Sequence, residues 1–166
     1  METLLPNIYL VEDDPFYNEV VKKSLAKSHF KIKTFTSGAD YLKEIQRHQP
    51  DLAIIDYELK NANGMDLVEK TKSLNSSINV VILSAQQKLE LISEAIKCGA
   101  SYIHKDQTAF SKLKMIAHRT EIDMVERRED RMAMIYRIVF FVIFTLLAIA
   151  VIILRHRDPA LFNNRG

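Results

Sequence analysis

The sequence predicts an α/β fold in which a five-stranded parallel sheet carries helices on both faces and a long C-terminal helix follows. Short apolar runs alternate five times with stretches of helical periodicity between residues 5 and 117, which is typical of a parallel sheet with crossover helices. Polar residues follow each apolar run and mark where a strand ends. Near the end of the chain, residues 138–154 form an uncharged apolar run, which is long enough to enter a membrane.

Five runs have the length and composition of strands. Three of them are wholly apolar, as expected for strands that are buried on both faces. The second run alternates Lys31 and Lys33 with less polar side chains, which is typical of an exposed edge strand. The fifth run is short and ends at His104. The expected strands are residues 8–11, 31–35, 52–55, 80–83 and 101–104.

The segments between these strands have helical spacing. Pro15 suits the first turn of a helix, and the acidic residues before it suit a helix N-terminus. Gly99 is placed to end a helix, and Thr108 is placed to cap one. The expected helices begin at Pro15, cover residues 39–47, 65–74 and 89–98, and begin again at Ala109.

Composition limits the classes of function. The 166 residues have room for one ordinary domain and an appendage, and a net charge of +2 gives no reason to expect nucleic acid as a partner. Cys98 is the single cysteine, so an internal disulfide is excluded and a reducing compartment is expected. The N-terminus lacks the pattern of a cleaved signal peptide.

The residues that follow four of the strands carry complementary chemistry. Asp13, Asp56, Ser84 and Lys105 stand at the carboxyl ends of the first, third, fourth and fifth expected strands, where ligands bind in open parallel sheets. With Glu12, three carboxylates would share one pocket, and their repulsion calls for a cation. Oxygen ligands without His or Cys favour Mg²⁺. Asp56 is then placed to attack a phosphoryl group as a nucleophile, with Lys105 and Ser84 contacting its oxygens.

About two-thirds of the chain resembles the receiver domain of two-component response regulators. The resemblance rests on five segments: Ile8-Tyr9-Leu10-Val11-Glu12-Asp13-Asp14-Pro15, Leu52-Ala53-Ile54-Ile55-Asp56-Tyr57, Gly64, Val81-Ile82-Leu83-Ser84-Ala85, and Gly99-Ala100-Ser101-Tyr102-Ile103-His104-Lys105. It implies a flavodoxin-like, doubly wound (βα)5 fold. It also implies a phosphoprotein that works in phosphorelay signal transduction.

The resemblance assigns roles to individual residues. Asp56 is implied as the phosphoacceptor, and Asp13 and Asp56 as direct Mg²⁺ ligands. Glu12 is implied to act through water, and Glu58 through its backbone carbonyl. Ser84, Tyr102 and Lys105 match positions that respond to the phosphoryl group, Ser84 and Tyr102 as the switch pair and Lys105 as the phosphoryl contact. Phosphoryl transfer to Asp56 would be self-catalysed, and no turnover enzyme is expected.

The phosphodonor implied by the resemblance is a sensor histidine kinase or a phosphotransfer protein. The effector is an unidentified protein.

Four positions bear on the resemblance, two that depart from the family pattern and two that resemble tuning positions. Lys60 and Asp106 stand where many relatives carry proline, and Glu58 and Gln86 occupy positions that resemble those tuning dephosphorylation.

The apolar run predicts a membrane anchor. As a helix, residues 138–154 span about 26 Å at about 1.5 Å per residue, slightly less than a ~30 Å hydrocarbon core. We therefore expect a receiver domain (5–117), a charged helical linker (118–137), a transmembrane helix (138–154) and a short polar tail (155–166). The receiver would face the cytoplasm at the inner membrane, in a single-pass protein that has no output domain. A weak coiled-coil homodimer through the linker is an alternative to a single solvated helix.

Two other functions stay open. Phosphatases of the haloacid dehalogenase superfamily also use an Asp nucleophile, Mg²⁺, a hydroxyl and a lysine, and Asp56-Tyr57-Glu58 faintly resembles their Asp-x-Asp start. Their acidic metal pair comes late in the chain, whereas here it follows the first strand. A constitutive membrane scaffold with a receiver-like fold, which never needs phosphate, is the other alternative.

Overall fold

The computed structural model describes residues 5–26, 28 and 30–157. The chain divides into two compact units, residues 1–124 and 125–166. The elements in chain order are β1 (Asn7–Val11), α1 (Pro15–Ala26), β2 (Lys31–Phe35), α2 (Gly38–Ile45), β3 (Leu52–Asp56), β4 (Glu58–Leu59), β5 (Ala62–Asn63), α3 (Gly64–Leu74), β6 (Asn79–Ser84), α4 (Leu89–Lys97), β7 (Ser101–His104) and α5 (Ala109–Arg157).

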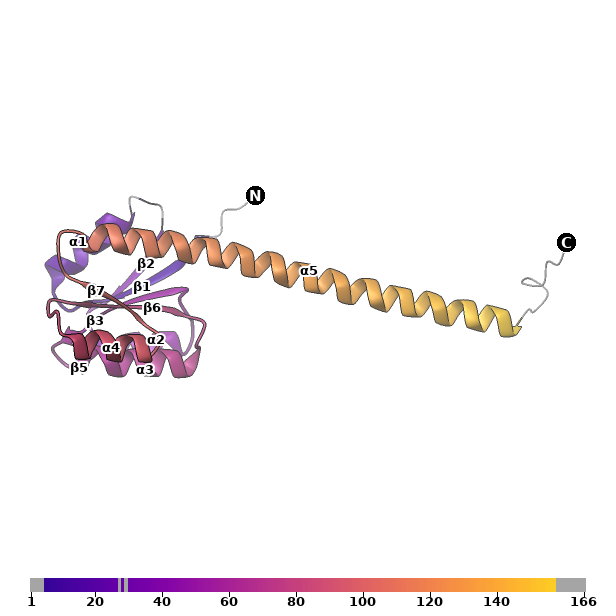
Figure 1. The fold of residues 1–166 in the computed structure, drawn as a ribbon, viewed down its shortest axis with the longest axis horizontal. Helices are drawn as coiled ribbons and strands as arrows, with labels where there is room; N and C mark the ends of the chain where they lie inside the picture. The colour runs from indigo at the N-terminus through magenta and orange to yellow at the C-terminus, as the bar shows by residue number, and fades with distance from the viewer. Residues whose placement is uncertain (1–4, 27, 29, 158–166) are drawn as a thin grey trace. The chain divides into compact units, whose positions relative to one another are not determined.

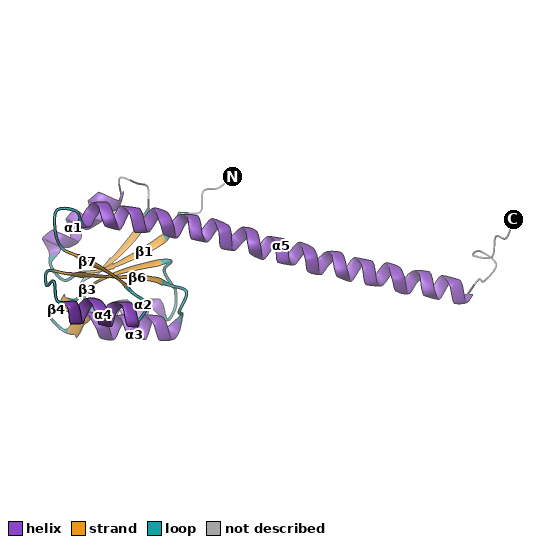
Figure 2. Cartoon of the chain, viewed as in Figure 1, coloured by secondary structure: helices purple, strands orange, loops and turns teal. Residues whose placement is uncertain are grey.

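The first unit is the predicted doubly wound α/β fold. Its five-stranded sheet has the order β2-β1-β3-β6-β7, and every neighbouring pair is parallel. Helices α1 and α5 cover one face, and α2, α3 and α4 cover the other (Figures 1 and 2). The flavodoxin-like fold is confirmed. The expected edge position of the alternating strand β2 is also confirmed.

Strand periodicity divides the core into two layers. In β1, Ile8 and Leu10 join the cluster formed with α1 and α5, whereas Tyr9 and Val11 join the cluster formed with α2, α3 and α4. Successive side chains of a strand point to opposite faces, so a strand covered on both faces must be apolar throughout. This explains why β1 and β3 read as unbroken apolar runs, and why polar residues gather only where the strands end.

Local signals fix most of the helix ends. The Asp14 carboxylate caps α1 by accepting hydrogen bonds from the backbone N–H groups of Phe16 and Tyr17, at 2.8 and 2.9 Å. Gly99, with φ of 74°, follows α4, and the N–H groups of Gly99 and Ala100 bond the carbonyls of Ile96 and Ala95, which is a Schellman ending.

Thr108 directly precedes α5, as predicted for a cap, and its carbonyl accepts the backbone N–H of Lys112 at 3.0 Å. The Thr108 hydroxyl donates to the carboxylate of Asp106, at 2.6 Å, and Asp106 also accepts the N–H of Thr108. Asp106 therefore organises the turn before α5, because a carboxylate is the stronger hydrogen-bond acceptor.

One small element was not predicted. Strands β4 and β5 pair antiparallel directly after β3, with Glu58 opposite Asn63 and Leu59 opposite Ala62. Two-residue strands leave no periodic signal in a sequence. This hairpin matters because its turn carries Lys60 toward the end of β1.

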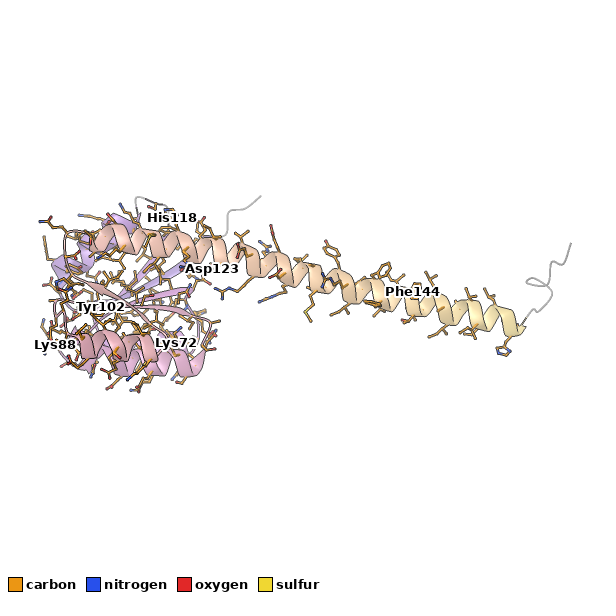
Figure 3. The ribbon with its side chains drawn as sticks, viewed as in Figure 1. Lys72, Lys88, Tyr102, His118, Asp123 and Phe144 are labelled. Carbon is orange, nitrogen blue, oxygen red and sulfur yellow. The ribbon has the colours of Figure 1, made fainter. Side chains whose placement is uncertain are left out.

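Helix α5 contributes to both units. In the first unit, Ala109, Leu113 and Ala117 are fully buried against the sheet. In the second unit, the described side chains are exposed, and Phe144 is 61% exposed (Figure 3). Among the described residues, one helix, Ala109–Leu154, is long and apolar enough to cross a membrane by length and composition.

Candidate functional site

The site lies at the carboxyl edge of the sheet, where the strand order reverses. Glu12 and Asp13 follow β1, and Asp56 is the last residue of the neighbouring strand β3. Ser84 ends β6 and Lys105 follows β7. Parallel strands bring their carboxyl ends to one edge, so residues that are far apart in sequence meet here as expected.

Three carboxylates form the acidic part of the site. Ligand oxygens of Glu12, Asp13 and Asp56 all lie within 4.8 Å of one another. Glu12 is 1% exposed and Asp56 is 4% exposed, whereas Asp13 is partly exposed. Buried like charges at this spacing repel strongly unless cations offset them.

Lys105 supplies the first of these cations. Its Nζ lies 2.8 Å from Glu12 Oε2 and 2.9 Å from Asp56 Oδ1, and its backbone N–H bonds the carbonyl of Ser84. Burial lowers the pKa of the Lys105 ammonium, but hydrogen bonds to the two carboxylates outweigh burial, so the pKa is raised. Lys105 is therefore charged and is held directly against Asp56.

Lys60 supplies the second cation. Its Nζ lies 3.6 Å from Asp13 Oδ2, and its backbone N–H donates to the same oxygen at 3.3 Å. The sequence indicated Lys60 only as a departure from a family pattern. Its contact with Asp13 depends on the β4–β5 hairpin, which was not predicted.

The charge balance of the site remains negative. Three carboxylates face two ammonium groups, those of Lys60 and Lys105. The pKa of Glu12 is raised to about 6, mainly because the carboxylate is buried and also because Asp56 repels it, and these effects outweigh the lowering effect of the hydrogen bond from Lys105. The donor set is all oxygen, which fits a hard divalent cation such as Mg²⁺. The role predicted for the Glu58 carbonyl stays a prediction.

Gly64 allows the backbone to pack tightly behind Asp56. A Cβ atom added at Gly64 would lie 2.4 Å from the carbonyl oxygen of Asp56 and 2.7 Å from the Cα of Tyr57. Both neighbours are main-chain atoms that cannot move aside. The sequence marked Gly64 as a motif residue, and the structure gives the physical reason.

A polar network joins Ser84 to Tyr102 through the loop after β6. The fully buried Ser84 hydroxyl accepts the backbone N–H of Gln86 at 3.0 Å, and the Tyr102 hydroxyl donates to the Gln86 carbonyl. The Gln86 side-chain amide donates to the Glu58 carboxylate. The predicted switch pair is therefore connected through Gln86, while Glu58 and Gln86 bridge the two loops that border the site.

Tyr17 is a further residue beside the site. Its ring centroid lies 4.4 Å from Lys105 Nζ. Sequence reasoning missed it because Tyr17 belongs to helix α1, and the search for site residues followed strand ends. Its position one turn after the acidic segment is the only sequence signal that could have drawn attention to it.

Comparison with known families gives one clear result. A family model described as the response regulator receiver domain matches residues 8–117. The match covers the first unit from β1 into the part of α5 that packs on the sheet. It includes all of the residues placed in the site above.

Two curated proteins illustrate the similarity. The chain is 28% identical to the transcriptional regulatory protein MalR of Bacillus subtilis (strain 168) over 135 residues, which is 75% of this chain and 57% of that protein. It is 24% identical to the chemotaxis protein CheY of the same organism over 94 residues, which is 56% of this chain and 78% of that protein. The match spans about half the length of MalR and of two other transcriptional regulators, and about a quarter of the length of two more.

Solved structures share the fold. A CheY-like receiver domain protein from Methanospirillum hungatei JF-1 has a TM-score of 0.67 at 23% sequence identity, covering 74% of this chain and 98% of that chain. The receiver domain of Francisella response regulator 1452 has a TM-score of 0.66 at 21% identity, covering 72% and 98%. At these identities the likeness concerns the fold alone.

Proposed function

This chain belongs to the response regulator receiver domain family, and we propose that it accepts a phosphoryl group on Asp56 and switches the binding of a protein partner. Receiver domains are signalling domains that take the phosphoryl group from histidine kinases or phosphotransfer proteins in two-component systems. The donor and effector of this chain belong to those classes in our proposal. Its own chemistry rests on the site residues.

The transfer step is a displacement at phosphorus. An Asp56 carboxylate oxygen forms the new bond to phosphorus while the bond from phosphorus to the donor's histidine nitrogen breaks, and the electron pair of that bond stays with the imidazole. Asp56 is nearly buried and lies beside Lys105. The Lys105 ammonium is placed to balance negative charge on the phosphoryl oxygens, because it already contacts the acceptor carboxylate. Ser84 would contribute its hydroxyl from the end of β6.

The acidic residues supply the metal ligands in this proposal. Asp13 and Asp56 would hold Mg²⁺ directly, Glu12 would act through water, and the Glu58 carbonyl would complete the protein's share. When bound, the ion would neutralise charge on the transferring group. The observation that supports this assignment is the all-oxygen cluster of Glu12, Asp13 and Asp56, which lies beside Lys105.

The free energy of the new contacts can be compared with the free energy that a conformational switch requires. A hydrogen bond to a charged group contributes about 1.5–3 kcal/mol, and driving a two-state element from 1:99 to 99:1 takes about 5.5 kcal/mol. Two contacts of about 3 kcal/mol, or three of about 2 kcal/mol, from the phosphoryl group to Ser84, Lys105 and the metal ion would reach this value. Gln86 contacts both Ser84 and Tyr102, so in our proposal it transmits a movement of Ser84 to the face formed by α4 and β7.

The second unit is a membrane anchor in our proposal. Residues 138–154 would form the transmembrane helix, with residues 118–137 as a charged linker and 155–166 as a polar tail, and the receiver (5–117) would face the cytoplasm at the inner membrane. The apolar composition and exposure of this helix support the assignment. That the receiver acts without an output domain stays a prediction, and a weak homodimer through the linker stays an alternative.

Intact mass spectrometry tests the acceptor. The full chain in detergent is incubated with a small acyl phosphate and Mg²⁺, beside Asp56→Asn and the control Asp66→Asn, which changes an exposed carboxylate on α3. We expect one phosphoryl adduct on the wild type and on the control, and none on Asp56→Asn. When a chelator removes Mg²⁺ before the acyl phosphate is added, no adduct should form on the wild type.

Two outcomes would contradict the proposed function. An unmodified wild type would exclude Asp56 as an acceptor. Continuous release of inorganic phosphate at an undiminished rate would instead indicate a phosphatase of the haloacid dehalogenase type.

A further inference from the structure

The aromatic ring of Tyr17 has a place in the site that metal binding and phosphoryl contact do not explain. Tyr17 lies on α1, and the centre of its ring is 4.4 Å from Lys105 Nζ. This is well within the ~6 Å over which an ammonium is attracted to the face of an aromatic ring. The ring therefore contacts Lys105, whose ammonium bonds Asp56.

The Lys105 ammonium contacts two carboxylates besides the ring. An ammonium has three N–H groups, and two carboxylates, those of Glu12 and Asp56, lie at 2.8 and 2.9 Å from Nζ. These two carboxylates compete for the same cation, because they lie in one acidic cluster. A third contact on the remaining side limits how far the ammonium can move toward either of them.

The hydroxyl of Tyr17 does not explain why the residue is there. Among the described residues, the Tyr17 hydroxyl is the buried side-chain group without a hydrogen-bond partner. A buried hydroxyl without a partner is destabilising, so the favourable contribution of this side chain must come from its ring.

The ring itself is held from two sides. The Tyr17 backbone N–H bonds the capping carboxylate of Asp14 at 2.9 Å, and the ring packs on Phe110 of α5, with centroids 6.0 Å apart and ring planes at 32°. A ring fixed by a helix cap and by a neighbouring ring is a rigid surface for the ammonium.

We propose that Tyr17 is a positioning residue for phosphoryl transfer, whose ring face holds the Lys105 ammonium against Asp56. Without the ring, water would solvate the ammonium from the open side, and Lys105 would be free to shift toward Glu12. This proposal rests on the proposed function, since it concerns the rate at which Asp56 accepts the phosphoryl group.

Fluorination tests the contact without changing its shape. Phenylalanine and its mono-, di- and trifluorinated forms are introduced at position 17 of the full chain, and the phosphorylation rate with an acyl phosphate and Mg²⁺ is followed by intact mass. Fluorine withdraws charge from the ring face and weakens its attraction for a cation. We expect Tyr17→Phe to react within about twofold of the wild type, and each added fluorine to slow the reaction further.

Two substitutions complete the test. Tyr17→Leu, which keeps an apolar side chain but removes the ring, should react about tenfold more slowly, an effect between those of an exposed and a fully desolvated cation–π contact. The matched control is the same fluorinated series at Phe35, a buried ring whose nearby cation, Lys33 at 5.7 Å, does not contact the site. Fluorination at Phe35 should leave the rate unchanged.

An unfolding cycle gives a second readout that needs no phosphoryl group. Tyr17→Leu should lower the urea midpoint more in the wild-type background than in a Lys105→Met background, because the latter has already lost the contact. Equal shifts in both backgrounds, together with a flat fluorination series, would overturn the proposal. If the wild type forms no adduct, the proposed function fails and the positioning role fails with it; if only the Tyr17 series is flat, the acceptor assignment stands.

Discussion

Burial and the neighbouring charges together set the pKa of individual carboxylates in the site, as Glu12 illustrates. Glu12 is almost completely removed from water, and it contacts a cation, Lys105, on one oxygen and a backbone N–H on the other. These contacts only partly offset the cost of desolvation, so burial keeps the pKa of Glu12 raised, at about 6. A carboxylate held in this way gains more than an exposed one from any additional cation.

The raised pKa predicts a pH dependence of stability. Unfolding returns the pKa of Glu12 from about 6 to its ordinary value of 4.5, so the native state binds more protons between these values. The contribution of Glu12 to the free energy of unfolding therefore falls as the pH rises from below 4.5 to above 6, by about 2 kcal/mol at about 1.36 kcal/mol per pKa unit.

Urea unfolding in chelator measures this contribution. As the pH rises from well below 4.5 to well above 6, the difference in unfolding free energy between the wild type and Glu12→Gln should decrease by about 2 kcal/mol. Glu90→Gln, at an exposed position of α4, is the control for the loss of a carboxylate. A difference for Glu12→Gln that stays constant with pH would contradict the assigned burial of Glu12.

At the level of secondary structure, four of the five strands of the sheet each lead to a different group at the same edge, and Lys105 follows β7. β1 leads to Glu12 and Asp13, β3 ends on Asp56, and β6 ends on Ser84. The β4–β5 hairpin adds Lys60 from a turn, and α1 adds Tyr17. Regular elements therefore place the acidic and hydroxyl groups, whereas a short hairpin and a helix place the additional cation and ring.

Helix α5 packs on the sheet through a narrow apolar face in the first unit. Leu113 is fully buried there, whereas Met115, two positions along the same helix, is 65% exposed. Helix periodicity places residues two apart on different faces. The two positions therefore allow a matched test of where α5 contacts the sheet.

Alanine substitutions at the two positions should distinguish the buried face of α5 from its exposed face. Leu113→Ala is expected to lower the free energy of unfolding by about 2–5 kcal/mol, because it leaves a cavity in the core. Met115→Ala should change the free energy by less than about 0.5 kcal/mol, as expected for an exposed substitution. Denaturant unfolding of both variants measures the difference, and equal effects would show that this helix does not pack as described.

At the scale of the whole molecule, two units of different character share one chain. The first contains the sheet, the site and two apolar cores, and the second is a helix whose described side chains are exposed. Apolar side chains exposed in such a long run are unfavourable in water. A lipid bilayer would remove this cost, which supports the proposed anchor.

Truncation tests the anchor. After reconstitution with lipid vesicles and alkaline washing, the full chain should float with the vesicles, whereas a chain ending at residue 137 should stay in solution. Leu147→Arg, which places a charge in the middle of the apolar run, should weaken insertion because a central arginine costs about 2.5–3.5 kcal/mol. Recovery of the full chain in the soluble fraction would contradict membrane anchoring.

The alternation of the five long strands and the helices along the receiver fold, and the residues at the strand ends, could be predicted from the sequence alone. Periodicity and strand length are local properties, so the alternation of elements, the edge character of β2 and the apolar tail are all readable along the chain. The same reasoning placed Asp13, Asp56, Ser84 and Lys105 at one edge of the sheet, because parallel strands all end there.

The way in which these groups interact depends on how segments that are distant in sequence pack against one another. Lys105 and Glu12 are 93 residues apart and Lys60 and Asp13 are 47 residues apart, yet each pair is in contact. Such contacts depend on distances between segments and on the exclusion of water, and neither property is written in a local pattern. The ring of Tyr17 against Lys105 and the burial of Glu12 follow from that packing, which is why no sequence pattern indicated them.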